Sequence, residues 1–208
     1  MQVYQEITLL PEAEIPLGFL WQKVYQQIHI ALVEHKVADN ESAVAMGFPE
    51  YGSKGFPLGR KLRLFASQEE VLQSLNIATY LSRLSDYVHL KSIQPVPETA
   101  SYASFVRHHV KGEARIEKDH QEKAQLWATK SGKSLQECLS ELAKTRPEPR
   151  NDLPFLWTES QETKKRDGDL VRKFPLFIRR SVQPVARAGV LTCYGLSHPE
   201  TPVGLPVF

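Results

Sequence analysis

Cysteine is scarce in this chain, because its 208 residues include two, Cys138 and Cys193. They are far apart and stand in segments that we expect to be helix and strand, so neither a disulfide framework nor a zinc site is predicted. Long apolar runs are also missing, since none approaches the roughly 20 residues of a membrane-spanning helix. The start MQVYQEITLLPEAE lacks a basic region followed by a hydrophobic one. We expect a cytoplasmic protein with no membrane partner.

Several chemical motifs are absent as well. The sequence has no close cluster of His, Cys, Asp and Glu at metal-ligand spacing, no glycine loop for nucleotides and no nucleophile elbow. We therefore expect neither a metal site nor a cofactor. The content of 41% hydrophobic and 24% charged residues is that of an ordinary globular protein, which argues against disorder.

Charge of one sign is not in excess over the whole chain, but its two halves differ. Residues 1–100 carry 8 Lys and Arg against 11 Asp and Glu, a balance of −3, whereas residues 101–208 carry 18 against 13, a balance of +5. Basic surface attracts polyanions, so the second half is the expected nucleic-acid binder.

The first half alternates strand and helix patterns. The expected order is strand, helix, strand, strand, helix, strand, over residues 3–10, 17–36, 42–49, 61–66, 67–81 and 87–90. His29 lies beside the apolar stripe of the first helix, and Ser67 with Glu70 forms a capping-box pattern before the second. This order is that of a ferredoxin-like unit, the architecture of RNA-recognition domains, although a fold alone fixes no function.

The second half begins after Pro95 and Pro97, which supply a stiff extended connection. We predict an α+β protein with an N-terminal ferredoxin-like (RRM-like) domain at residues 1–94. A second, smaller α+β domain with a basic helix and antiparallel strands is predicted at residues 95–208. Its expected elements are a strand at 102–110, helical segments over 112–144 broken near Ser131 and Gly132, and strands at 153–158, 170–178 and 188–194.

Cleavage of RNA by its own 2′-hydroxyl suits a chain with a ferredoxin-like start, a basic second half and no metal or nucleotide motif. The 2′-oxygen attacks the neighbouring phosphorus, so the protein must accept a proton, align the ribose and tolerate charge on the phosphate. No metal is required. Histidine suits the proton transfer because its unperturbed pKa is about 6.5.

Several segments of the chain carry a family resemblance, namely QKVYQQIHIALVEH, LPFLWTESQ, KFPLFIRR, LTCYGLS and the closing Phe208. In order and approximate spacing they are similar to the type I-F CRISPR pre-crRNA-processing endoribonucleases, the Ypest-subtype repeat-cleaving family. The resemblance covers most of the chain and is weak from about residue 112 to 150.

The resemblance implies a site. It implies that His29 acts on the 2′-hydroxyl, that Ser160 holds the attacking ribose and that Tyr194 orients the histidine. It places Phe174 under the terminal base pair of a hairpin. The best matches to the family's RNA-binding residues are Arg107, His109, Lys111, Arg115, Lys118, Lys123 and Phe174. Apart from the resemblance, we expect RNA contacts from Gln161, Lys164, Lys165, Arg166 and Arg172, the cations through phosphates. In the family the helix that enters the groove is dense in arginine, whereas here acidic residues alternate with the basic ones.

The resemblance also implies an activity. The protein would bind the CRISPR repeat stem-loop and cut precursor RNA at the 3′ base of the hairpin, without metal or cofactor, leaving a 5′-hydroxyl. It would then stay on the mature RNA with the other subunits of the type I-F interference complex, and it would be a monomer when free.

Other interpretations stay open on the sequence alone. One alternative is a repeat-RNA-binding subunit that does not cut, and another is a ferredoxin-like protein-interaction module unrelated to RNA. His29 could be a packed residue, Phe174 and Tyr194 could fill a core, and the mixed charges after Arg115 could form a solvated helix face.

Overall fold

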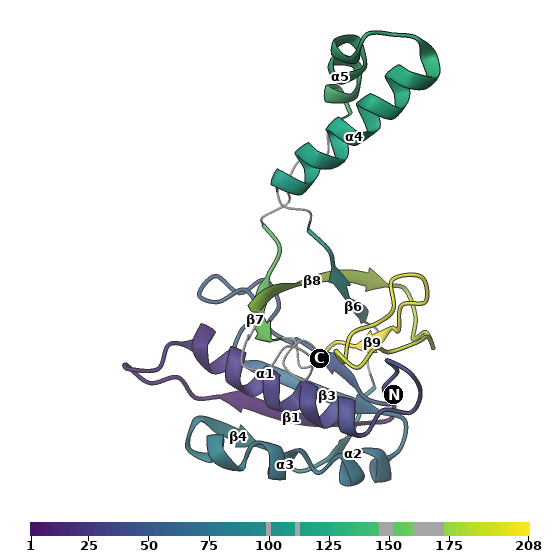
Figure 1. Ribbon diagram of the computed structural model, residues 1–208. Helices are drawn as coiled ribbons and strands as arrows, with labels where there is room; N and C mark the ends of the chain where they lie inside the picture. Colours follow the sequence, from purple (N-terminus) through teal and green to yellow (C-terminus); the bar gives the residue numbers. More distant parts are fainter. Residues whose placement is uncertain (99–100, 111–112, 146–151, 160–172) are drawn as a thin grey trace. The chain divides into compact units, whose positions relative to one another are not determined.

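A computed structural model describes residues 1–98, 101–110, 113–145, 152–159 and 173–208. The elements in chain order are β1 (Val3–Leu9), α1 (Leu17–Glu34), β2 (Ala45–Gly47), β3 (Lys61–Ala66), α2 (Glu69–Leu75), α3 (Ile77–Tyr80), η1 (Ser82–Tyr87), β4 (Val88–Leu90), β5 (Gln94–Pro95), β6 (Tyr102–His108), α4 (Glu113–Ser131), α5 (Leu135–Ala143), β7 (Phe155–Glu159), β8 (Lys173–Gln183) and β9 (Leu205–Pro206) (Figure 1). Contacts divide the chain into a main unit, residues 1–108 with 154–208, and a helical unit, residues 109–153.

The first sheet of the main unit has the strand order β2-β3-β1-β4, and β5 also pairs with β1. All of these pairs are antiparallel. Together with α1 and α2, this order is that of a ferredoxin-like unit. The predicted α+β class with a ferredoxin-like first half is therefore confirmed.

Helix α1 forms because its apolar residues recur at spacings of three and four, which gather them on one side. Leu20, Val24 and Ile28 are fully or almost fully buried in the core that α1 shares with the first sheet. Burial of each such side chain contributes about 1.5–3 kcal/mol. Pro16 precedes the helix with a φ of −66°, the angle that its ring fixes. This packing holds the helix, and with it His29, in one orientation.

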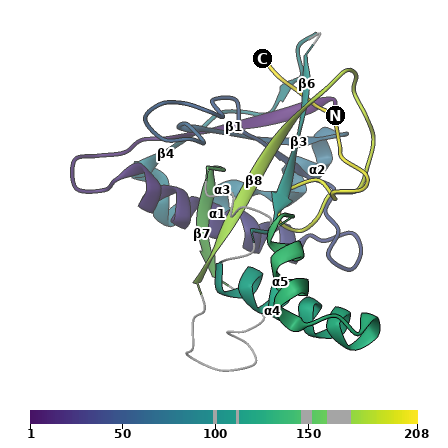
Figure 2. The same cartoon turned by 90° about the horizontal axis from the view of Figure 1, so that it is seen from above.

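The second sheet has the order β7-β8-β6-β9, again antiparallel (Figure 2). Its inward side chains, among them Phe105, Leu176 and Ile178, belong to the same buried core as the ferredoxin-like sheet. The main unit thus has one continuous core with α1 at its edge against β7. The predicted boundary between residues 94 and 95 stays a prediction; it falls within β5, which pairs with β1 in the first sheet.

The other face of the first sheet carries the end of the chain. The guanidinium of Arg63 lies 4.0 Å from the ring centroid of Phe208 and donates from Nη1 to its carbonyl oxygen, while Arg63 Nε donates to buried Glu6 at 2.9 Å. The ring of Tyr4 meets Phe208 edge-on at 5.0 Å. RNA-recognition domains bind RNA on this kind of sheet face. Here Phe208 lies on it.

Three local predictions are wrong. The helix expected over 67–81 breaks at Asn76, whose left-handed φ of 43° separates α2 from α3. Ser67 makes no capping box, because α2 begins after Gln68 and has no side-chain cap. Residues 188–194 form isolated bridges and a turn instead of a strand, and of their apolar side chains Leu191 and Cys193 are buried whereas Val190 is exposed.

The helical unit contains α4 and α5, joined at Gly132 with a φ of +72°. The predicted break near Ser131 and Gly132 is thus confirmed. A capping box between Ser134 and Glu137 begins α5. Across the part of the chain that the structure describes, no helix is both long enough and apolar enough to cross a membrane.

Candidate active site

A tight turn at residues 192–195 forms the base of the site. The amide of Gly195 donates to the carbonyl of Thr192 at 2.8 Å, and Thr192 donates to Leu196 at 2.9 Å. Gly195 has a φ of +69°, and a Cβ at that position would lie 2.6 Å from Cγ of Met46. Both the backbone angle and the lack of space therefore require glycine directly after Tyr194.

This turn is fastened to the ferredoxin-like part by backbone hydrogen bonds. The amide of Cys193 donates to Asn40 at 3.1 Å, and the amide of Met46 donates to Gly195 at 2.7 Å. Met46 lies in β2, so the turn is tied directly to the first sheet. The carbonyl groups of Cys193 and Tyr194 consequently have fixed positions.

His29 on α1 binds this turn. Its Nδ1 lies 2.8 Å from the carbonyl oxygen of Cys193. A carbonyl only accepts, so Nδ1 carries the hydrogen, and in the neutral ring Nε2 keeps a free lone pair. The imidazole also stacks on the ring of Tyr194, with centroids 4.7 Å apart and planes 9° from parallel. These contacts fix both the tautomer and the ring plane of His29.

Tyr25 lies one helical turn before His29 and makes a second link to the same turn. Its hydroxyl donates to the carbonyl oxygen of Tyr194 at 3.2 Å. Its ring is nearly parallel to that of His29, with a centroid distance of 6.2 Å and an angle of 7°. Burial raises the pKa of Tyr25 well above its ordinary value, and nearby Tyr194 adds to the effect. Tyr25 therefore remains a neutral hydrogen-bond donor.

Arg107 on β6 brings positive charge to the aromatic group. Its guanidinium carbon lies 4.7 Å from the ring centroid of Tyr194 and 5.3 Å from that of Phe174 on β8. Such cation–π contacts hold a planar cation over a ring face. Arg107, Phe174, Tyr194 and His29 thus form one connected cluster, although they come from four different segments of the chain.

The surroundings lower the pKa of His29. Burial is the largest cause, and the positive charge of Arg107 acts in the same direction. The hydrogen bond to Cys193 opposes them but does not outweigh them. His29 is 9% exposed. Its imidazole is therefore neutral at pH 7, with Nε2 able to accept a proton.

The end of β7 is joined to α1 close to His29. Gln26, three residues before His29, donates from Nε2 to Oε2 of Glu159 at 3.1 Å. Lys173 on β8 lies 3.9 Å from the other carboxylate oxygen of Glu159. Glu159 is the residue directly before Ser160 in the sequence. Ser160 itself lies outside the described residues.

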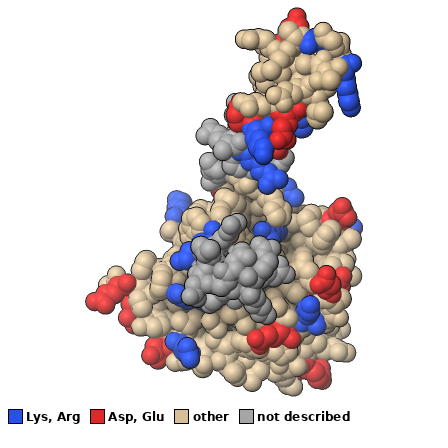
Figure 3. Space-filling view, viewed as in Figure 1, with Lys and Arg blue, Asp and Glu red and all other residues tan. Residues whose placement is uncertain are grey.

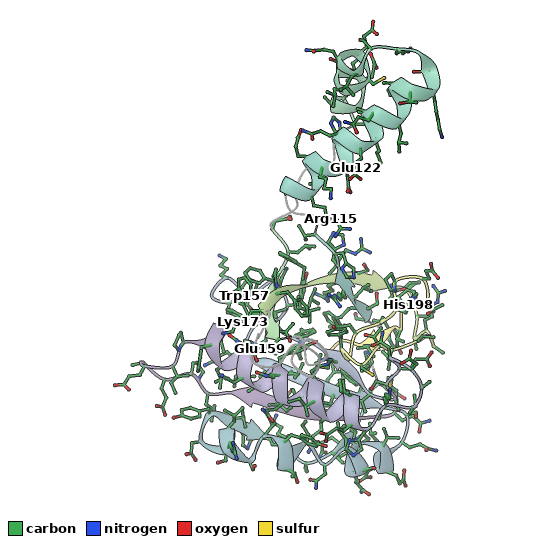
Figure 4. The ribbon with its side chains drawn as sticks, in the orientation of Figure 1. Arg115, Glu122, Trp157, Glu159, Lys173 and His198 are labelled. Atoms are coloured by element: carbon green, nitrogen blue, oxygen red, sulfur yellow. The ribbon has the colours of Figure 1, made fainter. Side chains whose placement is uncertain are left out.

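The remaining RNA-binding predictions fall on other parts of the chain. His109, Arg115, Lys118 and Lys123 belong to the helical unit, where Lys118 pairs with Glu122 at 3.8 Å. Figure 3 shows basic and acidic side chains next to one another on this unit, and Figure 4 labels Arg115 and Glu122 on α4. Outside the described residues lie Lys111, Gln161, Lys164, Lys165, Arg166 and Arg172.

The structure therefore brings together His29, Tyr194, Phe174 and Arg107. It adds participants that the sequence did not reveal, namely Tyr25, Gln26, Glu159 and the backbone carbonyl of Cys193. The position of Tyr25 four residues before His29 on one helix was the available signal for it. Within the described ranges, no group of three or more His, Cys, Asp or Glu side chains is arranged to hold a metal ion.

Comparisons with known proteins match nearly the whole chain to one family. The family model described as CRISPR-associated protein (Cas_Csy4) matches residues 4–208. A "CRISPR-associated endonuclease Cas6/Csy4" of Pseudomonas aeruginosa (strain UCBPP-PA14) is 28% identical over 199 residues, covering 95% of this chain and 96% of the relative. One of the same description from Escherichia coli (strain UTI89 / UPEC) is 28% identical over 204 residues, covering 97% and 98%. A solved "CRISPR associated protein Cas6" is similar at 10% identity with a TM-score of 0.31, too low to support a conclusion.

Proposed function

This chain belongs to the Cas_Csy4 family of CRISPR-associated proteins, and we propose that it is an endoribonuclease that cuts precursor CRISPR RNA at the 3′ base of the repeat hairpin. The proposal extends to this protein the activity that the names of its relatives state, which is that of CRISPR-associated endonucleases. The observation that carries it is the fixed, neutral His29 beside Tyr194, with a proton on Nδ1 and a lone pair on Nε2.

In the proposed reaction, Nε2 of His29 takes the proton of the 2′-hydroxyl on the 5′ side of the cut. The 2′-oxygen then forms a bond to phosphorus, and the bond from phosphorus to the 5′-oxygen breaks. The products are a 2′,3′-cyclic phosphate and, once its oxygen is protonated, a 5′-hydroxyl. All groups in this scheme are RNA atoms or side chains, so the reaction proceeds without metal.

The neighbouring residues have supporting roles in this scheme. Tyr194 holds the plane of His29, and Ser160 aligns the attacking ribose. Phe174 stacks under the last base pair, which positions the stem end beside the site. Arg107 lies close enough to the cluster to favour negative charge on the scissile phosphate.

We propose that the wider RNA surface lies mainly in residues 95–208. His109, Lys111, Arg115, Lys118 and Lys123 would contact the stem before and along α4. The segment after β7 would contribute the set Gln161, Lys164, Lys165, Arg166 and Arg172. Most of these cations would contact phosphates, which position RNA without reading its sequence. The product would stay bound, and the protein, a cytoplasmic monomer when free, would join the other subunits of the interference complex.

One experiment tests this function. The purified protein is incubated in EDTA with a labelled RNA of its native repeat, and the products are mapped on a denaturing gel. The expected result is a single cut at the 3′ base of the stem. A bound but intact RNA on a parallel native gel would favour a non-cleaving repeat-binding subunit, and neither binding nor cutting would refute the proposal.

The lowered pKa of His29 predicts a pH profile. The base form is the neutral one, so single-turnover cutting should stay constant through neutral pH and fall only below the ordinary pKa of 6.5. Arg107→Gln removes a charge that lowers this pKa, so the acid limb should move to higher pH. Rates at saturating RNA between pH 4.5 and 8.5 measure the shift. Arg83→Gln, the same change in η1, is the control and should leave the profile unmoved.

Tyr25→Phe keeps the ring beside His29 and removes the hydroxyl that binds the Tyr194 carbonyl. Cutting at saturating RNA should fall about fivefold with hairpin affinity unchanged, consistent with the loss of about 1 kcal/mol of positioning interaction. Tyr80→Phe is a matched control, since it removes a hydroxyl group that donates a hydrogen bond to Glu34, a residue of α1 like Tyr25. Equal effects of the two variants on the cutting rate would contradict the positioning role.

A further inference from the structure

The outward face of the second sheet carries a partly exposed aromatic surface. Alternate residues of β7 point to opposite faces, so buried Leu156 and Thr158 face the core. Phe155 and Trp157 face outward and are 40% and 48% exposed. Register places Phe177 of β8 directly opposite Phe155. We name the three rings of Phe155, Trp157 and Phe177 the aromatic platform.

The rings of the platform contact one another and stay partly exposed. Phe155 meets Trp157 edge-to-face at 5.9 Å with planes 88° apart, and it meets Phe177 at 5.3 Å with planes 46° apart. Neighbouring exposed rings of this kind often mark a binding surface. The exposed fractions of Phe155 and Trp157 leave part of each ring accessible to a planar ligand.

Basic groups surround the platform on the same face. The register opposes Phe177 to His108 and opposes Lys173 to Glu159, so these side chains share its face with Arg179 two residues beyond Phe177. Glu159 is already bound by Gln26 and lies near Lys173. Figure 4 shows Trp157, Lys173 and Glu159 close together. Lys173 and Arg179 thus bring positive charge to this face, and Glu159 offsets part of it.

The platform also adjoins the candidate active site through the sheet. Lys173 and Pro175 on its face flank Phe174, and His108 follows Arg107 in the chain. Arg107 and Phe174, two residues of the catalytic cluster, therefore lie on the opposite face of β6 and β8. Strand β7 is at the edge of this sheet. An RNA strand that passes from the cluster around this edge would meet the platform next.

We propose that the aromatic platform binds unpaired nucleotides that flank the base of the hairpin, by stacking bases on Trp157 and its neighbours. Aromatic rings on a sheet with nearby cations bind single-stranded RNA because every base has a π-face and every linkage a phosphate. Lys173 and Arg179 favour a phosphate-bearing partner over a purely apolar one. The proposal rests on the proposed function, because the hairpin brings the flanking nucleotides to this face.

The test compares three RNAs: the stem-loop, the stem-loop with an unpaired extension on either side, and the extension alone. A 2′-deoxy nucleotide at the cut prevents cleavage. The extension should tighten binding by the wild-type protein about tenfold. Trp157→Leu, which keeps an apolar side chain without a π-face, should lose this gain, and Trp157→Phe should largely keep it. Val182→Ala, on the same strand as Phe177 and more exposed than Trp157, is the control.

The outcomes separate the two proposals. Equal gains in wild type and Trp157→Leu, or no gain in wild type, would overturn the platform as an RNA site and leave it to a protein partner. Failure of the wild type to bind the stem-loop would refute the proposed function instead. In that case, the platform is still judged by whether binding of the extension alone depends on Trp157. Phe155→Leu replaces Trp157→Leu if the latter does not fold.

Discussion

His29→Ala is expected to reduce cutting of the repeat hairpin by about 10²–10⁴-fold, the usual contribution of a general base, while hairpin affinity stays unchanged. The substitution removes Nε2, the proposed proton acceptor, and frees the carbonyl of Cys193. Single-turnover rates in EDTA at saturating RNA, together with a binding titration on uncut RNA, measure the two quantities separately.

A second histidine, at the C-terminal end of α1, supplies a matched control for this substitution. His35 caps α1, and its Nδ1 lies 3.0 Å from the carbonyl of Ala31, so His35→Ala also removes a histidine with a backbone contact. It should cut at the wild-type rate. Tyr194→Phe, which keeps the stacked ring, should have a milder effect than His29→Ala. Unchanged cutting by His29→Ala would remove His29 from the mechanism.

Gly195→Ala should destabilise the fold by about 2–5 kcal/mol and reduce cutting even where the protein remains folded. A left-handed backbone costs a residue with a Cβ about 1–2 kcal/mol, and overpacking a filled interior adds about 1–3 kcal/mol. The clash involves Met46 Cγ at 2.6 Å and Leu32 Cδ1 at 3.1 Å. Relieving it displaces the turn that holds His29. Denaturant unfolding and cutting rates measure both effects.

Gly132→Ala separates backbone strain from crowding. Gly132 has a φ of +72°, close to that of Gly195, but a Cβ there would meet nothing within 4 Å. This control should therefore cost only about 1–2 kcal/mol, the strain of the left-handed backbone, and leave cutting unchanged. Equal destabilisation by the two variants would mean that contacts around Gly195 do not position the turn.

The sequence predicted most of the elements because their patterns are local. The spacing of Leu20, Val24 and Ile28 determines a helix whatever surrounds it, and the α1 prediction was confirmed. The segment at residues 188–194 was predicted incorrectly because buried Leu191 and Cys193 alternate with less buried neighbours, as they would in a strand. Its hydrogen bonds with Asn40 and Ser42 join it to a distant part of the chain, which no local pattern reveals.

Parts of the candidate site were accessible only through family resemblance or through coordinates. The pattern of α1 places His29 beside an apolar stripe, which alone describes many packed histidines. Its partners come from residues 107, 174 and 194, and no sequence spacing brings these together. Tyr25 was least visible, since a buried tyrosine at helical spacing is indistinguishable from core until its hydroxyl partner is known.

The most direct test of the account replaces one 2′-hydroxyl of the repeat RNA, on the nucleotide at the 5′ side of the cut, with hydrogen. The protein should bind this RNA as tightly as the unmodified repeat and leave it intact in EDTA, while the unmodified RNA is cut once at the stem base and yields a 5′-hydroxyl. Cutting of the deoxy-substituted RNA at the same bond would contradict attack by the 2′-oxygen, and with it the role assigned to His29.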